Sequence, residues 1–162
     1  MHGKAEQGTD ETVLRLVLDT NVWLDWLVFD DPRTSCIRTA LRDGRVAIFI
    51  DSRCEDELSR VLAYPLRKRA LDGAAQAACL AEFRRSTRRG ESGSAPDDIT
   101  GIRLPACRDP DDQKFLDLAL ACGADFLVTR DLALLELARR IARLRAFRIV
   151  DLAQIDTALA AR

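Results

Sequence analysis

The sequence predicts an α/β fold, a three-layer α/β/α sandwich with a central parallel β-sheet. Four short apolar runs of strand length alternate with segments whose apolar residues recur at helical spacing. Because parallel strands are joined by helical crossovers that cover both faces of the sheet, this alternation is typical of a sheet buried between two helical layers. A chain of 162 residues, 48% of them apolar, is long enough to bury one such core.

The first half of the chain contains two predicted strands and three predicted helices. The strands are the apolar runs 13–18 and 46–50, and the helices cover 22–29, a segment around 36–41 that stops at Gly44, and 51–62. A glycine after the last apolar residue of a helix commonly ends it, and the Asp51 and Ser52 side chains are suited to cap the helix after the second strand. Pro65 breaks that helix.

The second half alternates helices and strands in the same way. We expect helices at 72–87, 109–122, 132–144 and 153–160, and strands at 124–129 and 147–150. The helix at 109–122 has the clearest signals, because Asp109 suits the N-cap, Pro110 the first helical position and Gly123 the residue after the end. Residues 88–102 combine glycine, serine and proline and predict a long mobile loop.

One domain accounts for residues 13–162, after a disordered N-terminal tail at 1–12. Its segment 64–108 is basic, with nine lysine or arginine residues against five acidic ones, although the whole chain has a net charge of −1. A mobile basic insertion beside an acidic remainder suits a metal site next to a surface that follows a phosphate backbone. Solvated helix faces are the alternative interpretation of these charges.

Composition excludes several function classes. The N-terminal segment has no apolar stretch of a secretory signal, and no run approaches the roughly 18 apolar residues of a membrane span, so we expect a cytoplasmic protein. The five cysteines are never spaced as C-x-x-C and follow apolar patterns, which indicates reduced, mostly buried side chains and not a zinc site. The only histidine, His2, lies in the tail, so histidine acid–base chemistry is nearly excluded.

Two acids follow predicted strands at the positions where open α/β sheets bind ligands. Asp19 comes directly after the strand at 13–18, and Asp131 follows the strand at 124–129. Because ligands collect beyond the carboxyl ends of parallel strands, and these two strands are expected to be neighbours, the two carboxylates are expected to lie close together. The structural alternative is that each acid only caps a helix or forms a turn.

Two further acids lie on predicted helices. Asp112 shares the apolar stripe of Phe115, Leu116 and Ala119, and Asp111 lies on the same stripe, so spacing alone does not choose between the two aspartates. Glu57 lies roughly 40° outside the stripe of its own helix. Glu55 flanks the other side of that stripe at least as closely, so periodicity does not favour Glu57.

Taken in order, these motifs resemble the PIN-domain family of RNA-cleaving enzymes from Leu14 onward. The resemblance rests on Leu18-Asp19-Thr20-Asn21, on Glu57-Leu58, on Asp112 eleven residues before Gly123, and on Thr129-Arg130-Asp131. The string 109–135 is similar to the VapC-like toxins of toxin–antitoxin systems. One position departs from the pattern: many relatives place another acid two residues beyond Asp131, where this chain has Ala133.

The resemblance implies an endoribonuclease that uses one or two Mg²⁺ or Mn²⁺ ions, which prefer carboxylate oxygens. It implies Asp19 as the central ligand, with Asp112, Asp131 and Glu57 completing the catalytic acids. The residues implied to support these ligands or to contact phosphate are Thr20, Asn21, Thr129 and Asp111. The side chains suited to follow an RNA backbone are Arg67, Lys68, Arg84, Arg85, Arg88 and Arg89. Implied partners are RNA, a cognate antitoxin and a second copy of the chain.

Three alternatives compete with the nuclease. A catalytically silent PIN-like module would bind RNA or a protein without cleaving. A haloacid-dehalogenase-type phosphatase also begins with an aspartate after a strand, but it needs a second aspartate two residues later, where this chain has Asn21. A receiver domain of two-component signalling needs an acidic pair before its first helix. Metal-dependent cleavage by the purified protein separates the nuclease from all three.

Overall fold

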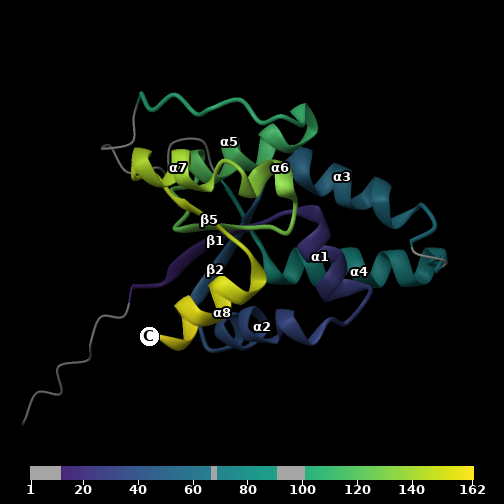
Figure 1. Ribbon diagram of the computed structural model, residues 1–162. Coiled ribbons are helices and arrows are strands. Elements are labelled where there is room, and N and C mark those ends of the chain that lie inside the picture. Colours follow the sequence, from purple (N-terminus) through teal and green to yellow (C-terminus); the bar gives the residue numbers. More distant parts are fainter. Residues whose placement is uncertain (1–11, 67–68, 91–100) are drawn as a thin grey trace, which may run out of the picture.

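A five-stranded, entirely parallel sheet forms the centre of the protein in a computed structural model that describes residues 12–66, 69–90 and 101–162 (Figure 1). The strand order is β3-β2-β1-β4-β5, and β1 is paired on both sides, with Leu16 opposite Ile48 and Leu18 opposite Val128. The strands are β1 (Leu14–Leu18), β2 (Val46–Ile50), β3 (Arg88–Arg89), β4 (Phe126–Val128) and β5 (Arg148–Val150).

Helices cover both faces of this sheet, which confirms the three-layer fold. Figure 1 shows α2 and α8 on one face and α5, α6 and α7 on the other, while α1 and α4 lie side by side. The helices are α1 (Thr20–Leu27), α2 (Ser35–Arg42), α3 (Ser52–Leu62), α4 (Gly73–Ser86), α5 (Gln113–Ala121), α6 (Leu132–Leu135), α7 (Ala138–Leu144) and α8 (Leu152–Ala160). Two 3₁₀ turns, η1 (Pro32–Thr34) and η3 (Pro110–Asp112), precede α2 and α5.

Three buried aromatic rings join α1 to α4. Trp23 stacks on Trp26 with ring centroids 5.0 Å apart and meets the edge of Phe83 at 4.7 Å. Trp23 and Phe83 are fully buried, and such aromatic pairs are a large part of a small core. Within the segment 64–108, predicted as a mobile basic insertion, residues 73–86 therefore form a helix that packs into the core.

The fifth strand, β3, was missed by the sequence prediction, which assigned its residues to a loop. Arg88 and Arg89 carry no apolar pattern, and their strand character comes from backbone pairing with Phe49 and Ile50. The Gly90 N–H continues this pairing and donates to the Ile50 carbonyl oxygen at 2.8 Å. The remainder of the predicted loop at 91–100, Arg67, Lys68 and residues 1–11 of the tail lie outside the described residues.

Two predicted helices differ from the structure at their ends. The single helix expected at 132–144 is divided into α6 and α7, because the Leu137 N–H bonds to the Leu134 carbonyl, three residues back, and interrupts the α-helical ladder. The helix expected from residue 109 opens as the 3₁₀ turn η3 and becomes α-helical only at Gln113. Gly44 and Gly123 do end α2 and α5, with positive φ angles of 72° and 63°.

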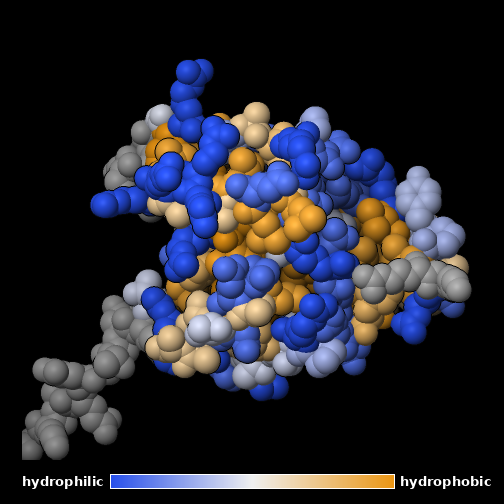
Figure 2. Space-filling view, viewed as in Figure 1, coloured by the Kyte–Doolittle hydropathy of each residue, from blue (hydrophilic) through white to orange (hydrophobic). Residues whose placement is uncertain are grey.

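On the face shown in Figure 2, hydrophilic side chains surround smaller areas of apolar atoms. Large apolar side chains that are exposed among the described residues are Val13, Tyr64, Leu132 and Leu144. None of the helices in the described ranges is long and apolar enough to cross a membrane. All five cysteines are free, and three of them are buried, as predicted.

Candidate metal centre

Acidic residues meet at the carboxyl edge of the sheet, between β1 and β4. From β1 the chain crosses to β2 on one side, while β4 and β5 lie on the other, so this is the point where the strand order reverses. In open α/β sheets the crevice at such a point is the usual ligand site. Asp19 follows β1 and Asp131 lies beyond β4, and the pairing of β1 with β4 confirms that their strands are neighbours.

Asp19 is buried and held by two hydrogen bonds. Its Oδ1 atom accepts from the Val22 N–H at 2.9 Å, which caps α1, and its Oδ2 atom accepts from the Thr129 hydroxyl. Thr129 Oγ1 in turn accepts from the Asp131 N–H at 2.9 Å. The pKa of Asp19 is raised to about 6, chiefly by burial and to a smaller extent by the Asp131 carboxylate, against the lowering effects of the two hydrogen bonds and of the Arg130 charge. Asp19 is thus a fixed carboxylate that lacks a full positive counter-charge.

Asp112 is a second partly buried carboxylate whose negative charge is not compensated by a cation of the described chain segments. It lies at the start of α5 without a side-chain capping bond, and its buried Oδ2 atom has no hydrogen-bond partner among the described residues. The pKa of Asp112 is raised to about 6, chiefly by burial and then by the negative charges of Asp131, Asp109, Asp19 and Glu57. Asp111, the residue that spacing could not separate from it, is exposed.

The structure also distinguishes Glu57 from Glu55. Glu57 lines a cavity of about 140 Å³ together with Asp19, Thr20, Asn21, Val61, Asp112 and Phe115. The Thr20 hydroxyl donates to Glu57 Oε2, and Lys114 Nζ lies 3.0 Å from Oε1. Glu55 is buried elsewhere, paired with Arg84 and Arg89 at 2.8 and 2.5 Å. Lys114 is not among the site residues predicted from the sequence, and its only signal is its place on the first turn of α5.

Asp131 stands at the side of this cavity and does not line it. Its Oδ1 atom accepts from the Ala133 N–H at 2.8 Å and caps α6, so its contribution to the centre is through its charge on Asp19 and Asp112. Ala133, the position of the missing acid, is buried, and its carbonyl oxygen accepts from the Cys107 thiol at 3.8 Å.

The donor set fits a hard divalent cation better than any other group. Carboxylate, hydroxyl and amide oxygens face one cavity without a histidine or cysteine, as Mg²⁺ and Mn²⁺ prefer. Among the described residues Asp112 has a buried oxygen without a hydrogen-bond partner, and the pKa values of Asp19 and Asp112 are raised. Both features indicate carboxylates whose ionised form a nearby cation would stabilise. As their side chains stand, no three described His, Cys, Asp or Glu residues are arranged to hold an ion.

Most of the described basic side chains proposed for RNA contact have acidic partners. Arg84 and Arg89 pair with Glu55, and Arg85 pairs with Glu82 at 2.5 Å. None of them lines the cavity at Asp19. A phosphate-binding role for this surface is therefore an expectation that rests on exposure, and Arg88 is its exposed member without an ion pair in the described part of the chain.

Acidification from pH 7 to pH 5 should stabilise the metal-free protein. The pKa values of Asp19 and Asp112 rise from 3.8 to about 6 in the folded state, so folding favours their protonated forms. Their contribution to folding stability is therefore fully present below about pH 4 and is lost as the pH rises through 6. We expect a gain of about 1–3 kcal/mol at pH 5 in urea unfolding with EDTA. Asp31, whose pKa the Arg33 side chain lowers to about 2, titrates below this window. A double variant, Asp19→Asn with Asp112→Asn, should lose the gain; an unchanged pH dependence in that variant contradicts the assignment.

Comparisons with known proteins agree with this geometry. The family model for the PIN domain matches residues 15–133. No curated protein matches the chain. Among solved structures, VapBC2 from Rickettsia felis, bound to a DNA fragment from their promoter, is similar with a TM-score of 0.54 and 14% identity, over 85% of this chain and 98% of that one. PAE2754 from Pyrobaculum aerophilum is similar with a TM-score of 0.50 and 19% identity, over 96% and 100%. At these identities the structures support the fold, and the sequence match establishes that the chain belongs to the PIN domain family.

Proposed function

We propose that the protein is a Mg²⁺- or Mn²⁺-dependent endoribonuclease that hydrolyses RNA phosphodiester bonds, with Asp19, Glu57, Asp112 and Asp131 as its catalytic acids. The observation that carries the proposal is the meeting of Asp19 and Asp112 at the reversal point of the sheet, both with raised pKa values, beside an unpartnered buried oxygen of Asp112. Carboxylates that repel one another in this way are stabilised by a cation, and PIN domains are in general nucleases.

The chain's own residues have separable roles in this proposal. A bound Mg²⁺ or Mn²⁺ would lower the pKa of a water and stabilise negative charge on the attacked phosphate. Asp19, fixed by Thr129 and the Val22 N–H, and Asp112 would hold the cation. Glu57, held by the Thr20 hydroxyl, would orient the attacking water and accept its proton. With Ala133 in place of an additional acid, Asp131 alone supplies the charge beyond β4.

Two of the surrounding polar groups are assigned to the substrate. The Asn21 side chain lines the cavity and has an amide N–H₂ to donate to a phosphate oxygen. Lys114 is charge-paired with Glu57, and its ammonium can turn to the phosphate once a cation replaces it beside the carboxylate. Asp111 is exposed and is assigned to solvent or substrate contact only.

We also propose that the protein is the toxin of a toxin–antitoxin pair in the cytoplasm, with a cognate antitoxin as partner. The similarity of residues 109–135 to VapC-like toxins supports this, as does the likeness of the fold to VapBC2. A second copy of the chain is a further candidate partner.

The silent PIN-like module is the second candidate, and the Lys114–Glu57 ion pair favours it because an ammonium already neutralises one of the four acids. The deciding experiment is incubation of purified protein with a mixed-sequence single-stranded RNA and either Mg²⁺, Mn²⁺ or EDTA. We expect internal cleavage with the metals and none with EDTA, read as product bands on a denaturing gel. Intact RNA under all metal conditions would overturn the nuclease proposal in favour of the silent module.

A further inference from the structure

A second, larger cavity lies beside the candidate metal centre at the same edge of the sheet. It has a volume of about 500 Å³, opens to solvent and is lined by η1, the start of α2, α6 and the start of α8. Cavities of this size hold small ligands. Arg130 belongs to its wall and directly precedes Asp131, and its positive charge partly opposes the rise in the pKa of Asp19. The two cavities are therefore neighbours with Arg130 between them.

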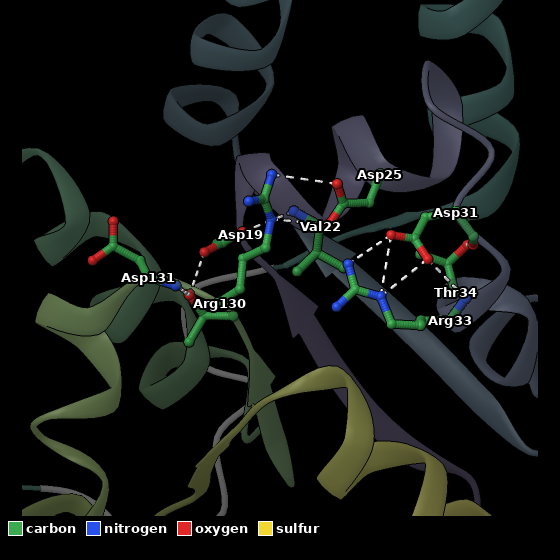
Figure 3. Close-up of polar contacts among 9 residues, drawn as sticks. Asp19, Val22, Asp25, Asp31, Arg33, Thr34, Arg130 and Asp131 are labelled. Atoms are coloured by element: carbon green, nitrogen blue, oxygen red, sulfur yellow. Dashed lines mark hydrogen bonds and ion pairs between the residues drawn. The ribbon is translucent and has the colours of Figure 1, made fainter. Parts of the chain in front are cut away.

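Arg130 is held in place by a buried carboxylate that the metal centre does not use. Asp25 is buried on α1, and Arg130 Nε lies 3.0 Å from its Oδ2 atom while Nη2 donates to Oδ1 at 3.3 Å. Figure 3 shows the Arg130 side chain extending past Asp19 to reach Asp25. A buried aspartate destabilises the fold unless it is paired. Asp25 is paired with the guanidinium of Arg130, and holding that group in place explains why an aspartate lies in this apolar helix.

The guanidinium keeps most of its donors available. Arginine has five N–H donors, and among the described residues Arg130 uses one of them, from Nη2, in a hydrogen bond. Within the described ranges Asp25 Oδ2 accepts no hydrogen bond, and it lies 3.0 Å from the charged Nε atom of Arg130. The side chain of Arg130 is about one third exposed, so these donors are accessible from the cavity. Fixed guanidinium groups of this kind bind phosphate by two hydrogen bonds.

A second arginine on the same wall is fixed in the same manner. Arg33 binds Asp31 through Nε at 3.1 Å and through Nη2 at 2.7 Å (Figure 3). The two pairs act on each other, because the Asp25 charge raises the pKa of Arg33 and the Arg130 charge lowers that of Asp31. Here hydrogen bonding between Arg33 and Asp31 is the larger cause. The cavity wall thus presents two oriented cations.

The other walls suit a base. Leu135 and Leu152 provide apolar surface, and the Asp151 and Asp156 carboxylates provide hydrogen-bond acceptors. Nucleobases stack on apolar or planar groups and donate N–H bonds from their edges. Carboxylates repel free phosphate, so the lining as a whole favours a ligand with one anionic end and one donor-bearing end.

We propose that this cavity, which we call the Arg130 cavity, binds one nucleotide of a single-stranded RNA next to the phosphate that is cut, with Arg130 and Arg33 on its phosphate and Asp25 as the positioning residue of Arg130. The proposal rests on the proposed function, because it assigns the cavity to the same substrate strand. It adds a site for a nucleotide, and hence a source of sequence preference at one position beside the cut.

The test is a titration of the ¹⁵N-labelled protein with nucleoside 5′-monophosphates in EDTA. Binding is measured from the changes in backbone amide chemical shifts. Inorganic phosphate and the free nucleosides are the comparison ligands. We expect shifts at Cys36, Leu135, Leu152 and Asp156, with at least one nucleotide binding about tenfold or more tightly than phosphate or its nucleoside. If nucleotides leave these amides unshifted, or bind no more tightly than phosphate, the cavity is not a nucleotide site.

Three variants locate the effect. Arg130→Gln removes charge-assisted hydrogen bonds and should weaken nucleotide binding about tenfold or more. Ala153→Phe should block the cavity from α8 without touching either arginine. Arg148→Gln, an exposed arginine at the opposite end of the sheet, is the matched control and should bind as the wild type does. Equal binding by the wild type and Ala153→Phe would overturn the assignment even if Arg130→Gln failed to fold.

The positioning role of Asp25 has its own readout. Asp25→Asn should weaken nucleotide binding in the wild type but change it little in the Arg130→Gln background, because its effect passes through Arg130. A purely structural Asp25 would lower the melting temperature and leave the two effects on affinity additive. The double variant also replaces the buried ion pair by two neutral amides, which avoids an unpaired buried charge.

These measurements separate the cavity from the nuclease activity. Binding in EDTA does not need cleavage, so nucleotide shifts at the Arg130 cavity together with intact RNA would sink the proposed function and leave only the nucleotide site standing, without its place beside a cut phosphate. Metal-dependent cleavage whose KM and cut positions are unchanged by Ala153→Phe would support the proposed function and overturn the assignment of the Arg130 cavity to the substrate strand.

Discussion

Asp19→Asn should reduce metal-dependent RNA cleavage by more than about 10³-fold, a loss of about 4 kcal/mol of transition-state stabilisation. The variant removes the charge of the central carboxylate at nearly constant shape. The asparagine Oδ1 can still accept from the Val22 N–H, and its amide can donate to the Thr129 oxygen, so α1 keeps its cap. The measurement is single-turnover cleavage of a labelled RNA with Mn²⁺, with wild-type protein in EDTA as the blank.

Asp56→Asn is the matched control for this experiment. Asp56 lies on α3 next to Glu57 but is exposed, so its loss should leave the rate within about twofold of the wild type. Circular dichroism of both variants should match the wild type. Retained cleavage by clean Asp19→Asn protein would remove the basis for placing the chemistry at this cavity.

The second large effect is on stability, and its sign is unusual for a substitution at a buried site. In EDTA, Asp19→Asn should raise the melting temperature by several degrees, since it relieves about 1–3 kcal/mol of charge burial at pH 7 that the raised pKa of Asp19 expresses. It should also remove most of the stabilisation that Mn²⁺ gives the wild type, which reaches about 2.7 kcal/mol at a hundred times the dissociation constant. Thermal melts of both proteins, with EDTA and with Mn²⁺, give all four values.

A purely structural Asp19 predicts the reverse result. As a cap and buried acceptor it would stabilise the fold, and its replacement would cost roughly 0.5–2 kcal/mol with or without metal. A lower melting temperature for the variant in EDTA, together with a wild type that ignores Mn²⁺, would show that no metal centre exists here.

The parts of the site that follow strands were predictable, and those on helices were not. An aspartate directly after an apolar run has one possible place, the carboxyl edge, and the pairing of β1 with β4 brought Asp19 and Asp131 together as expected. On α3 the two glutamates flank one stripe, and only the docking of α3 against α1 decides that Glu57 meets Thr20. For Asp111 and Asp112, the 3₁₀ turn before α5 rotates the chain by about 120° per residue, which a helical wheel at 100° does not describe.

Other features left no local signal in the sequence. Strand β3 is made of two arginines whose pairing depends on β2, so strand propensity says nothing about it. Asp25 stands in an apolar helix at 22–29 in the prediction, and its partner Arg130 is 105 residues away. Lys114 likewise meets Glu57 across 57 positions. Contacts of this kind are set by how the layers pack, which periodicity within one segment cannot report.

The short outer strands of the sheet bear on how this protein can meet another chain. An unpaired strand edge is a template to which a foreign strand can add its backbone, and long, flat, apolar edges are the ones that aggregate. Here one edge is the two-residue β3, with Arg88 and Arg89 exposed, and the other is the three-residue β5, which begins with exposed Arg148. In the described residues these short strands leave few backbone groups to register a partner strand, and like charges would meet between two copies. An antitoxin or a second copy is therefore expected to dock on helical faces or loops, and the sheet is protected from growing by strand addition.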